Sequence, residues 1–566
     1  MKSEVTPVNV SRAELTALAL RIEGLLPDSD YRMIKAVFET LMHMMLLLDS
    51  KRMTIRRLCR WLFGASSEKT HHVLKSATIG NAALAAAVGG VVHEGEGAAA
   101  ARTAKLPKPG HGRHSAQDYP GAEQISIAHP RLSAGSDCPE CEAGKVYPVG
   151  PTVVVRVTGH APLHACIYKL GKLRCHLCGK LFTAPAPAQM GTQKYDAKAA
   201  AMIASLRYGS GMPFYRQEQL QGNLGMPLAA STQWDIVAPA ARVVEPVHAA
   251  LIYHAGQGQI LHNDDTPAKI LALMAATKTA ASLVAPANKD KPRTGIFTTG
   301  IVALHGEQKI ALFFTGPQHA GENLADVLAH RDAQLPAPIQ MCDALSRNLP
   351  KNLQVSIAHC LAHARRLVVD VAPRFPDACA RVLTLLGEVY KNDAHAKEHA
   401  LSNDARLAYH QAHSAGPMNE LHRWCGAQFE QRTVEPNSGL GKAIKYLRKH
   451  WQRLTLFLRV AGAPVDNNVC EQALKRAILS RKNSLFYRTQ AGAHVGDIFM
   501  SLIHTCHLNG VNAFAYLSAL LEHRADWAGN EKAWMPWNYA TALERVEHPV
   551  SRTASRRATD HTDAGR

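Results

Sequence analysis

Gln259-Ile-Leu-His-Asn-Asp-Asp-Thr-Pro267, a short apolar run that ends in two adjacent carboxylates, decides the fold. Its apolar start is typical of a β-strand, and the proline after the acids marks the end of that strand. Further apolar runs predict strands at residues 295–304, 309–314 and 339–343, with a helix over residues 321–330. Residues 269–274 resume an apolar run, which we interpret as a neighbouring strand.

The order of these elements places two aspartates at strand ends. Asp264 lies at the end of the first strand and Asp343 at the end of the run at 339–343, while residues 355–358 predict a short strand that leads into a basic helix. This β-β-β-α-β order is that of the ribonuclease H-like topology, in which the first and fourth strands lie side by side. By this fold-level analogy, two acids far apart in the sequence meet at one edge of the sheet.

A third carboxylate, Glu471, begins a predicted helix within Pro464-Val-Asp-Asn-Asn-Val-Cys-Glu-Gln-Ala-Leu-Lys475. It has two interpretations. Asn468 can cap the helix while Glu471 reaches back to the backbone N–H of the cap, which is a capping box. Alternatively, Glu471 joins Asp264 and Asp343 in holding two Mg²⁺ ions, because phosphodiester cleavage uses paired hard cations that prefer carboxylate oxygens. Each aspartate also has a simpler explanation as a turn or strand-end residue.

Four cysteines form two Cys-x-x-Cys pairs, Cys138 with Cys141 and Cys175 with Cys178. Together the pairs supply four thiolates, which is the ligand set of a tetrahedral Zn²⁺ site. Four thiolates leave no open coordination position, so we predict a structural role for the zinc. The 12 cysteines of the chain otherwise lack tight spacing, which argues against a disulfide scaffold and for a reducing compartment.

The chain has 566 residues and a formal net charge of +18, which favours a polyanionic partner such as DNA. Basic residues gather in a predicted N-terminal helix and in the helix after Glu471. The predicted DNA-binding residues are Arg56, Arg57, Arg60, Lys475, Arg476, Arg481 and Lys482. The sequence has no apolar run of about 18 residues and no signal-peptide pattern, so we expect a soluble, unsecreted protein without a membrane partner.

Several motifs occur in one order over most of the chain. They are Trp61-Leu-Phe-Gly-Ala-Ser-Ser-Glu-Lys69, the two Cys-x-x-Cys pairs, Leu261-His-Asn-Asp-Asp-Thr-Pro267, Cys360-Leu-Ala-His-Ala-Arg-Arg366 and Asp466-Asn-Asn-Val-Cys-Glu-Gln-Ala-Leu-Lys475. In this order the chain resembles the insertion-sequence sixty-six family, the large DDE transposase subunit of bacterial mobile elements. The resemblance implies that Asp264, Asp343 and Glu471 form the catalytic triad, and that Asp264 rather than Asp265 is its first member.

The resemblance also implies a function, which is to cut the ends of an insertion element and join them to target DNA. The implied cofactors are two catalytic Mg²⁺ ions, with Mn²⁺ as an alternative, and a structural Zn²⁺. The implied partners are double-stranded DNA, further copies of this chain and small accessory proteins of the same element, in the nucleoid of the bacterial cytoplasm. Cys360 and His363 resemble a Cys-x-x-His string of several DDE transposases, and with Asp265 they are expected to support the site.

Two other functions remain open at this point. A Mg²⁺-dependent nuclease without strand transfer would use the same three acids. A zinc-containing DNA-binding regulator without catalysis would use them only as structural residues. It would not need the acids to cluster.

The whole chain is therefore expected to be a multidomain α+β protein, with a ribonuclease H-like α/β catalytic core and a helical insertion, an N-terminal helical domain and a zinc-binding module. The expected segments are an N-terminal helical DNA-binding or dimerisation region (1–65), a flexible basic linker (66–130), the zinc-binding module (131–187), a helical connector (188–255), the first part of the core (256–372), the helical insertion (373–461), the C-terminal helices of the core (462–525) and a C-terminal tail (526–566).

Overall fold

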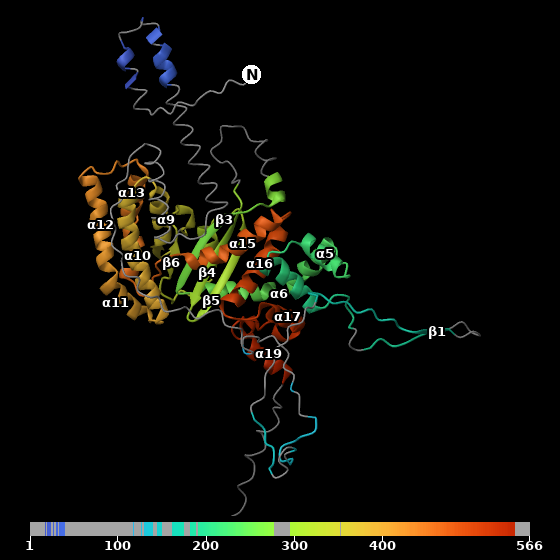
Figure 1. Cartoon of the computed structure of the whole chain (residues 1–566). Helices are drawn as coiled ribbons and strands as arrows, with labels where there is room; N and C mark the ends of the chain where they lie inside the picture. The colour runs from blue at the N-terminus through green and yellow to red at the C-terminus, as the bar shows by residue number, and fades with distance from the viewer. Residues whose placement is uncertain are drawn as a thin grey trace, which may run out of the picture. The chain divides into compact units, whose positions relative to one another are not determined.

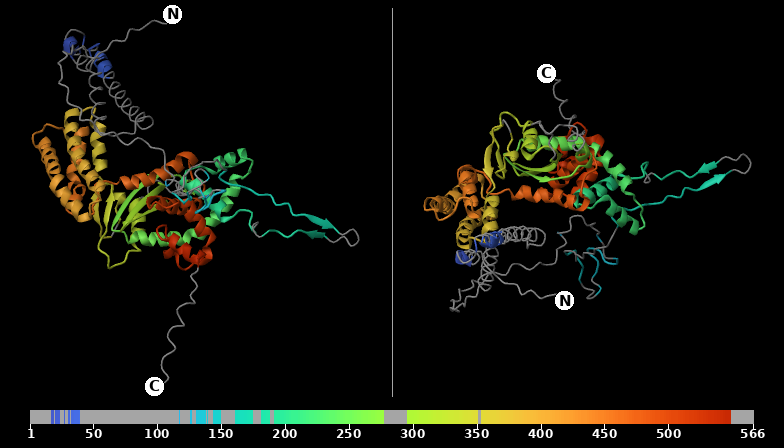
Figure 2. Two further views of the ribbon diagram at one scale, coloured as in Figure 1. Left: turned by 60° about the horizontal axis from the view of Figure 1, so that its bottom comes forward. Right: turned by 90° about the horizontal axis from the view of Figure 1, so that it is seen from above.

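The structure is a computed structural model, drawn as a ribbon in Figure 1 and from two further directions in Figure 2. It describes residues 161–174, 181–187, 191–276, 295–350 and 353–548, and before these 17–18, 20–23, 27, 30–31, 33–39, 117, 126, 130–137, 139 and 144–149. The predicted DNA-binding residues Arg56, Arg57 and Arg60 lie outside the described residues, and so do the four cysteines Cys138, Cys141, Cys175 and Cys178.

The chain divides into two compact units. One unit comprises residues 1–84 and 369–384, and the other comprises residues 85–368 and 385–566. In the first unit, the described residues of 17–22 and 30–39 are helical. All three acids of the predicted triad belong to the second unit, so the fold of that unit decides their geometry.

A five-stranded sheet forms the centre of the second unit, with the strand order β5-β4-β3-β6-β7. The central strand β3 (Ile260–Pro267) pairs antiparallel with β4 (Phe297–His305) and parallel with β6 (Ile339–Cys342). Outside these, β5 (Gln308–Gly316) is antiparallel to β4, and β7 (Ser356–His359) is parallel to β6. The predicted strands are thus present, and the first and fourth of them lie side by side.

One strand prediction is wrong. Residues 271–276 are helical, and Ile270 makes only an isolated bridge to Tyr487. The apolar run instead serves a small separate cluster, in which the buried Ile270 packs with Ile296 and Ala493. An apolar run this short is compatible with a strand or a buried helix, so periodicity alone could not decide between them.

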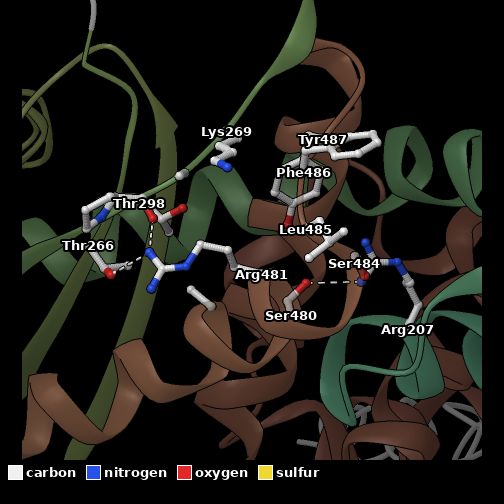
Figure 3. Close-up of a pocket in the computed structure, with 13 residues that line it drawn as sticks. Arg207, Thr266, Lys269, Thr298, Ser480, Arg481, Ser484, Leu485, Phe486 and Tyr487 are labelled. Atoms are coloured by element: carbon white, nitrogen blue, oxygen red, sulfur yellow. Dashed lines mark hydrogen bonds between the residues drawn. The ribbon is translucent and has the colours of Figure 1, made fainter. Parts of the chain in front are cut away.

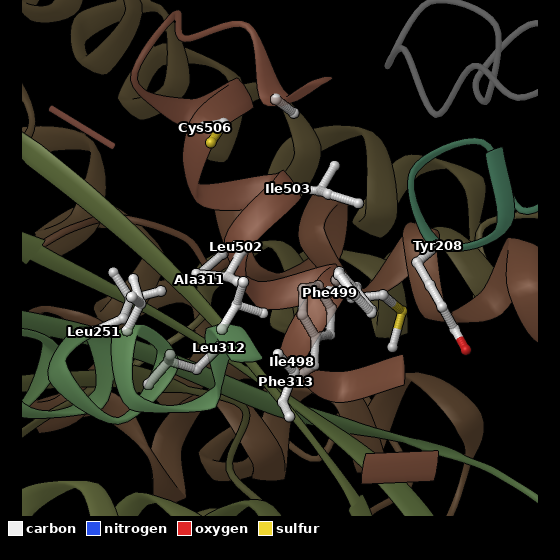
Figure 4. Close-up of a cluster of buried hydrophobic side chains, with 14 of the residues drawn as sticks. Tyr208, Leu251, Ala311, Leu312, Phe313, Ile498, Phe499, Leu502, Ile503 and Cys506 are labelled. Atoms are coloured by element: carbon white, nitrogen blue, oxygen red, sulfur yellow. The ribbon is translucent and has the colours of Figure 1, made fainter. Parts of the chain in front are cut away.

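The edge strand β5 is closed by helix α16 (Gln490–Leu508). Asp497, Ser501 and Thr505, spaced four residues apart on the helix, accept hydrogen bonds from the backbone N–H groups of Thr315, Phe313 and Ala311 at 2.7, 2.9 and 3.0 Å. Four helical residues advance about 6 Å and two strand residues about 6.8 Å, so the two repeats stay in register along this ladder of hydrogen bonds. Apolar residues of α16 fill the core beside the ladder (Figure 4).

Helix α6 (Ala230–Gly256) is the only described helix whose length and apolar composition would suffice to cross a membrane. Val237, Val244, Val247 and Leu251 on this helix are fully buried in the main hydrophobic core. The helix also packs against strands β4 and β5. Its apolar character is therefore used within the fold, as in the core helix of a globular protein.

The remaining elements are mostly helical, as expected for residues 195–254, 373–461 and 502–521. Before the sheet come α4 (Ala197–Ala204), the π-helix η3 (Ser205–Gly209) and α5 (Phe214–Asn223). Within and after the sheet come α8 (Ala320–Leu328), the 3₁₀ turn η4 (Ser346–Asn348), α9 (Leu361–Val371), α10 (Pro376–Glu398), α11 (Asn403–His413), α12 (Ala415–Glu430), α13 (Gly439–Lys449), α14 (Trp451–Leu454), η5 (Leu456–Leu458) and α15 (Asn468–Ser484).

The described residues of the predicted C-terminal tail are folded. After α17 (Ala513–Glu522) come α18 (Arg524–Trp527), the 3₁₀ helix η6 (Glu531–Trp534) and α19 (Tyr539–Glu547). Trp527 and Trp534 are almost completely buried in the main core, and the Trp527 indole N–H donates to a backbone carbonyl of α17 at 2.7 Å. Only residues 549–566 of the expected tail lie outside the described chain.

Candidate catalytic site

The two predicted aspartates lie close together, one within β3 and one directly after the neighbouring strand β6. Asp264 lies on β3, and Asp343 directly follows β6, which runs parallel to β3. The side-chain amide of Asn348 donates to both carboxylates, to Asp343 Oδ1 at 2.6 Å and to Asp264 Oδ1 at 3.3 Å. The structure therefore brings together two acids that are distant in the sequence.

Asn348 is a site residue that the sequence did not reveal. It ends the turn η4 and is fully buried, and its backbone carbonyl accepts hydrogen bonds from the side chains of Asn263 at 2.8 Å and Gln340 at 2.7 Å. These bonds fix the turn against β3 and β6, so the amide faces the two acids. The only signal in the sequence is an amide residue five positions after a strand-end acid, which is too common to identify a site.

The third acid, Glu471, does not close a capping box. Helix α15 has Asn467 as its N-cap residue and no side-chain cap, and Asn468 bonds to Asp466 at 2.8 Å instead. The carboxylate of Glu471 lies 3.6 Å from His363 Nδ1 and 3.6 Å from Arg366 Nη2, both on α9. The capping-box interpretation is therefore wrong.

Asn467 occupies the N-cap position of α15, but its side chain does not cap the helix. Instead, the side chain of Asn467 anchors the helix to the sheet. Asn467 bonds through Oδ1 to His262 Nδ1 at 3.0 Å and donates from Nδ2 to the carbonyl of Asn263 at 3.2 Å. All three residues are buried. Because His262 and Asn263 immediately precede Asp264, these bonds place the first turn of α15 beside that acid.

A glycine allows α15 to approach the sheet closely. Gly300 on β4 pairs directly with Asp264, and its carbonyl accepts a hydrogen bond from the Cys470 thiol at 3.3 Å. A Cβ atom on Gly300 would lie 2.9 Å from the side chain of Leu474, which is too close for an ordinary contact. The absence of a side chain at this position thus brings Glu471, one residue after Cys470, to the edge where Asp264 lies.

The two aspartates of the cluster have no compensating cation among the described residues, whereas Glu471 lies near Arg366 and His363. Burial raises the pKa of Asp264 to about 7, and the nearby carboxylates of Asp343 and Glu471 add to that rise. No lysine or arginine in the described part of the chain lies within ion-pair distance of Asp264 or Asp343, and Asp343 is only 9% exposed. Glu471 Oε1 is buried and has no hydrogen-bond partner among the described residues. Carboxylate oxygens in this state fit a hard divalent cation.

The neighbouring acid Asp265 points to the opposite face of the strand, as alternate residues of a strand do. Its side chain is fully buried, and it lies 3.1 Å from His319 Nδ1 and 3.2 Å from Arg347 Nη2. The charge of this carboxylate is therefore compensated by its own neighbours. Asp264 and Asp265 have different roles, and Asp264 is the member that faces the other acids.

Cys360 and His363 belong to the same neighbourhood. One ligand atom each from Cys360, His363 and Glu471 lie within 4.8 Å of one another, a spacing that a metal ion could bridge. Burial raises the pKa of the Cys360 thiol to about 12, and the thiol accepts a hydrogen bond from the Asn467 N–H at 3.2 Å. A thiol, an imidazole and a carboxylate suit a softer ion than Mg²⁺.

The predicted DNA-binding residues of α15 divide into two kinds. Arg476 donates to the carbonyl of Gly209 at 3.1 Å, and Arg481 donates to Thr266 Oγ1 at 3.0 Å, so both also tie the helix to neighbouring segments. Lys475 and Lys482 are exposed. These two are the α15 cations that remain fully available to a partner.

Comparison with known proteins finds relatives of this chain. Three uncharacterised proteins of Sinorhizobium fredii (strain NBRC 101917 / NGR234) are similar to the chain. The protein y4jD is 28% identical over 64% of this chain and 70% of its own length, y4hP is 25% identical over 66% and 67%, and y4qI is 26% identical over 60% and 62%.

No solved structure matches the chain. The family model described as "Transposase IS66 family" matches residues 193–495, which is more than half of the chain and includes all three clustered acids. The protein therefore belongs to the IS66 family of transposases.

Proposed function

We propose that the protein cuts the ends of an insertion element and joins them to target DNA by two-metal DDE chemistry, with Asp264, Asp343 and Glu471 as the catalytic acids. The observation that supports this proposal is that the three acids lie close together, and that no lysine or arginine among the described residues forms an ion pair with either aspartate. Membership of a transposase family implies a DNA-processing role and the use of a divalent metal.

The proposed fold of the catalytic core is ribonuclease H-like. The strand order β5-β4-β3-β6-β7, in which β4 alone runs antiparallel to its neighbours β3 and β5, supports this assignment. The helices α10 to α14 with η5, within residues 373–461, form the proposed insertion. The insertion separates Glu471 in the sequence from the two aspartates that it joins in space.

In the proposed mechanism, Asp264, Asp343 and Glu471 hold two Mg²⁺ ions, for which Mn²⁺ can substitute. Bound metal ions would lower the pKa of an attacking water or 3′-hydroxyl and offset the charge that develops on the leaving oxygen. The protein supplies the rest. Asn348 holds the two aspartates together through its amide, and His363 and Arg366 hold the carboxylate of Glu471 near them.

The proposed zinc module rests on two paired segments. Strands β1 (Lys172–Arg174) and β2 (Leu181–Thr183) form an antiparallel hairpin, and its connection contains Cys175 and Cys178. An antiparallel bridge between Asp137 and Lys145 likewise spans the sequence that contains Cys138 and Cys141. Two Cys-x-x-Cys pairs, each between paired segments, support a structural Zn²⁺ site with four thiolates.

The proposed partners are double-stranded DNA at the element ends and at the target, further copies of this chain, and small accessory proteins of the same element. The proposed location is the bacterial cytoplasm, in association with the nucleoid. The net charge of +18 supports the DNA partner, since a surplus of this size is stabilised by a polyanion.

To test this function, the protein is incubated with Mg²⁺, a target plasmid and a DNA fragment that carries the inverted repeats flanking the gene of this protein. We expect nicked ends and joined products, and neither product with Asp264→Asn. Nicks without joined products would support the nuclease instead. DNA binding without any Mg²⁺-dependent cleavage would support the regulator.

A further inference from the structure

A second site lies beyond the strand that carries Asp264. A pocket of about 360 Å³, counted out to its open mouth, is lined by the end of β3 with the residues that follow it, by the C-terminal half of α15 and by η3 (Figure 3). Thr266, two residues after Asp264, is part of its wall. Two strand residues span about 7 Å, so the pocket adjoins the acidic cluster.

A buried cation without an acid partner lines this pocket. Arg207 is only 6% exposed, and its guanidinium donates to Ser480 Oγ at 3.1 Å and lies over the rings of Tyr208 and Phe214. No carboxylate among the described residues lies within ion-pair distance of it. A buried guanidinium that lacks a counter-charge is costly, and an anionic ligand would offset that cost.

Three further donors surround the same space. Arg481 lines the pocket, and its described hydrogen bonds use only Nη1 of its guanidinium. Lys269 is exposed at the pocket and has no carboxylate partner in the described chain. The hydroxyl of Ser484 is buried without a hydrogen-bond partner among the described residues. The guanidinium of Arg481 and the ammonium of Lys269 are donors that suit a phosphate group at the mouth of the pocket, and Arg207 adds positive charge deeper in its wall.

A strained turn holds an aromatic ring at the rim of this pocket. Leu485 has φ 67° and ψ −44°, and the N–H of Phe486 donates to the carbonyl of Ser484 at 2.8 Å, which is a γ-turn of the rare kind with positive φ. The next residue, Tyr487, is fixed to Lys269 by a backbone hydrogen bond of 2.9 Å. Phe486 is 41% exposed and Leu485 is 63% exposed, so a strained turn presents apolar side chains to solvent.

We propose that this pocket is a nucleotide subsite for the DNA strand that passes through the acidic cluster. A phosphate group of the strand lies at the mouth of the pocket beside Arg481 and Lys269, and the base of that nucleotide lies against the ring of Phe486. The enclosed part of the pocket admits a group about the size of a water molecule, which fits a phosphate oxygen and excludes a base. An exposed aromatic ring beside a cationic groove is the usual platform for an unpaired base. This assignment rests on the proposed function, because it assumes a DNA substrate.

The experiment measures binding separately from cleavage. The full chain with Asp264→Asn is titrated with a fluorescent single-stranded 12-nucleotide DNA, and anisotropy is followed at several salt concentrations. Lys269→Glu should weaken binding roughly tenfold and reduce the slope of log affinity against log salt by about 0.7 for each phosphate that the protein no longer neutralises. Phe486→Ala should weaken binding roughly fivefold or more, without changing that slope.

Both substituted side chains are exposed, so these variants should fold. Lys442→Glu is the matched control, because Lys442 is an exposed lysine on α13 that does not line the pocket. If Lys269→Glu and Phe486→Ala bind the strand no more weakly than Lys442→Glu does, the subsite assignment is wrong.

Inorganic phosphate provides the second arm of the experiment, with thermal stability as its readout. Suppose that phosphate stabilises the protein, that Lys269→Glu abolishes this stabilisation, and that Lys269→Glu leaves the affinity for the DNA strand unchanged. That set of results would assign the pocket to a free phosphate and overturn the DNA subsite. Loss of strand binding in the two pocket variants, combined with an absence of Mg²⁺-dependent cleavage in the unmodified protein, would retain the subsite and reject the proposed function.

Discussion

Two buried carboxylate sites of this protein, Asp393 in the insertion and the acids around Asp264 in the sheet, differ in which charges lie next to them. In the insertion, burial alone would raise the pKa of Asp393, but the hydrogen bond to His410 and the charges of Arg406 and Lys397 together hold that pKa well below its usual range. On the central strand β3, burial and the neighbouring carboxylates raise the pKa of Asp264 instead. Asp393 is thus a buried acid that its own cations compensate, whereas Asp264 lies beside further carboxylates and without a cation in the described chain, which is the state that a bound metal ion would compensate.

The largest expected effect is that of Asp264→Asn, which tests the uncompensated group directly. Cleavage and joining should fall by at least about 10³-fold, because one carboxylate of the metal site is lost. The thermal unfolding midpoint without metal should not fall, since the substitution removes a repelling charge. Binding of end DNA should remain nearly intact, and loss of binding with retained cleavage would contradict the assignment.

The second effect concerns the compensated group. Asp393→Asn should lower the free energy of unfolding by about 3 kcal/mol, because it leaves the largely buried Arg406 without its carboxylate and removes the ion pair with the exposed Lys397. Thermal and urea unfolding measure this change. Asp404→Asn is the control, since Asp404 is an exposed acid on the adjacent helix α11 and should change stability little. Equal stability of the two variants would remove the contrast between the two groups.

Metal addition should separate the same two groups with a smaller effect. Mg²⁺ at about 100 times its dissociation constant should stabilise the unmodified protein by about 2.7 kcal/mol. The response should persist in Asp393→Asn and disappear when Asp264 and Asp343 are both replaced by Asn, because only the acids around Asp264 bind the ion. Thermal shift against Mg²⁺ concentration measures it, and an undiminished response in the double variant would place the ion elsewhere.

The smallest effect is expected for Asp497, a third buried acid. Burial raises its pKa to about 8, although hydrogen bonds from Thr315 favour the charged form and offset part of that rise. Because the folded state binds this proton more tightly than the unfolded state, its contribution to stability is complete below about pH 4 and is lost as the pH rises through about 8. Asp497→Asn should therefore flatten the fall in thermal stability between about pH 4 and pH 8, and an unchanged profile would show that Asp497 is charged throughout.

The sequence predicted the parts of the fold that depend on local pattern. Alternation and apolar runs located β3, β4, β5 and β6, and the order of these strands predicted that Asp264 and Asp343 would lie close together. The first inference uses apolar runs, whereas the second rests on fold-level analogy with the ribonuclease H-like topology, in which the first and fourth strands are adjacent.

The contacts that position the site could not be predicted. Asn348 reaches both aspartates only because η4 folds back onto β3 and β6, and Asn467 anchors α15 only because it meets the side chain of His262. The local sequence pattern predicted Asn468 as the N-cap residue. In the structure the N-cap position is Asn467, and hydrogen bonds from its side chain to β3 fix the start of the helix. Arg207 gave no signal, because an isolated arginine is unremarkable until its burial and the lack of an acid partner are known.

The long insertion before α15 also has a consequence for the order of folding. The strands that carry or precede Asp264 and Asp343 are synthesised well before Glu471, since the helices α10 to α14 lie between them in the chain. Domains fold progressively as the chain is synthesised from its N-terminus. A nascent or prematurely ended chain can thus form strands of the sheet while it still lacks its third acid, so under the proposed function a chain that ends within the insertion should not cleave DNA.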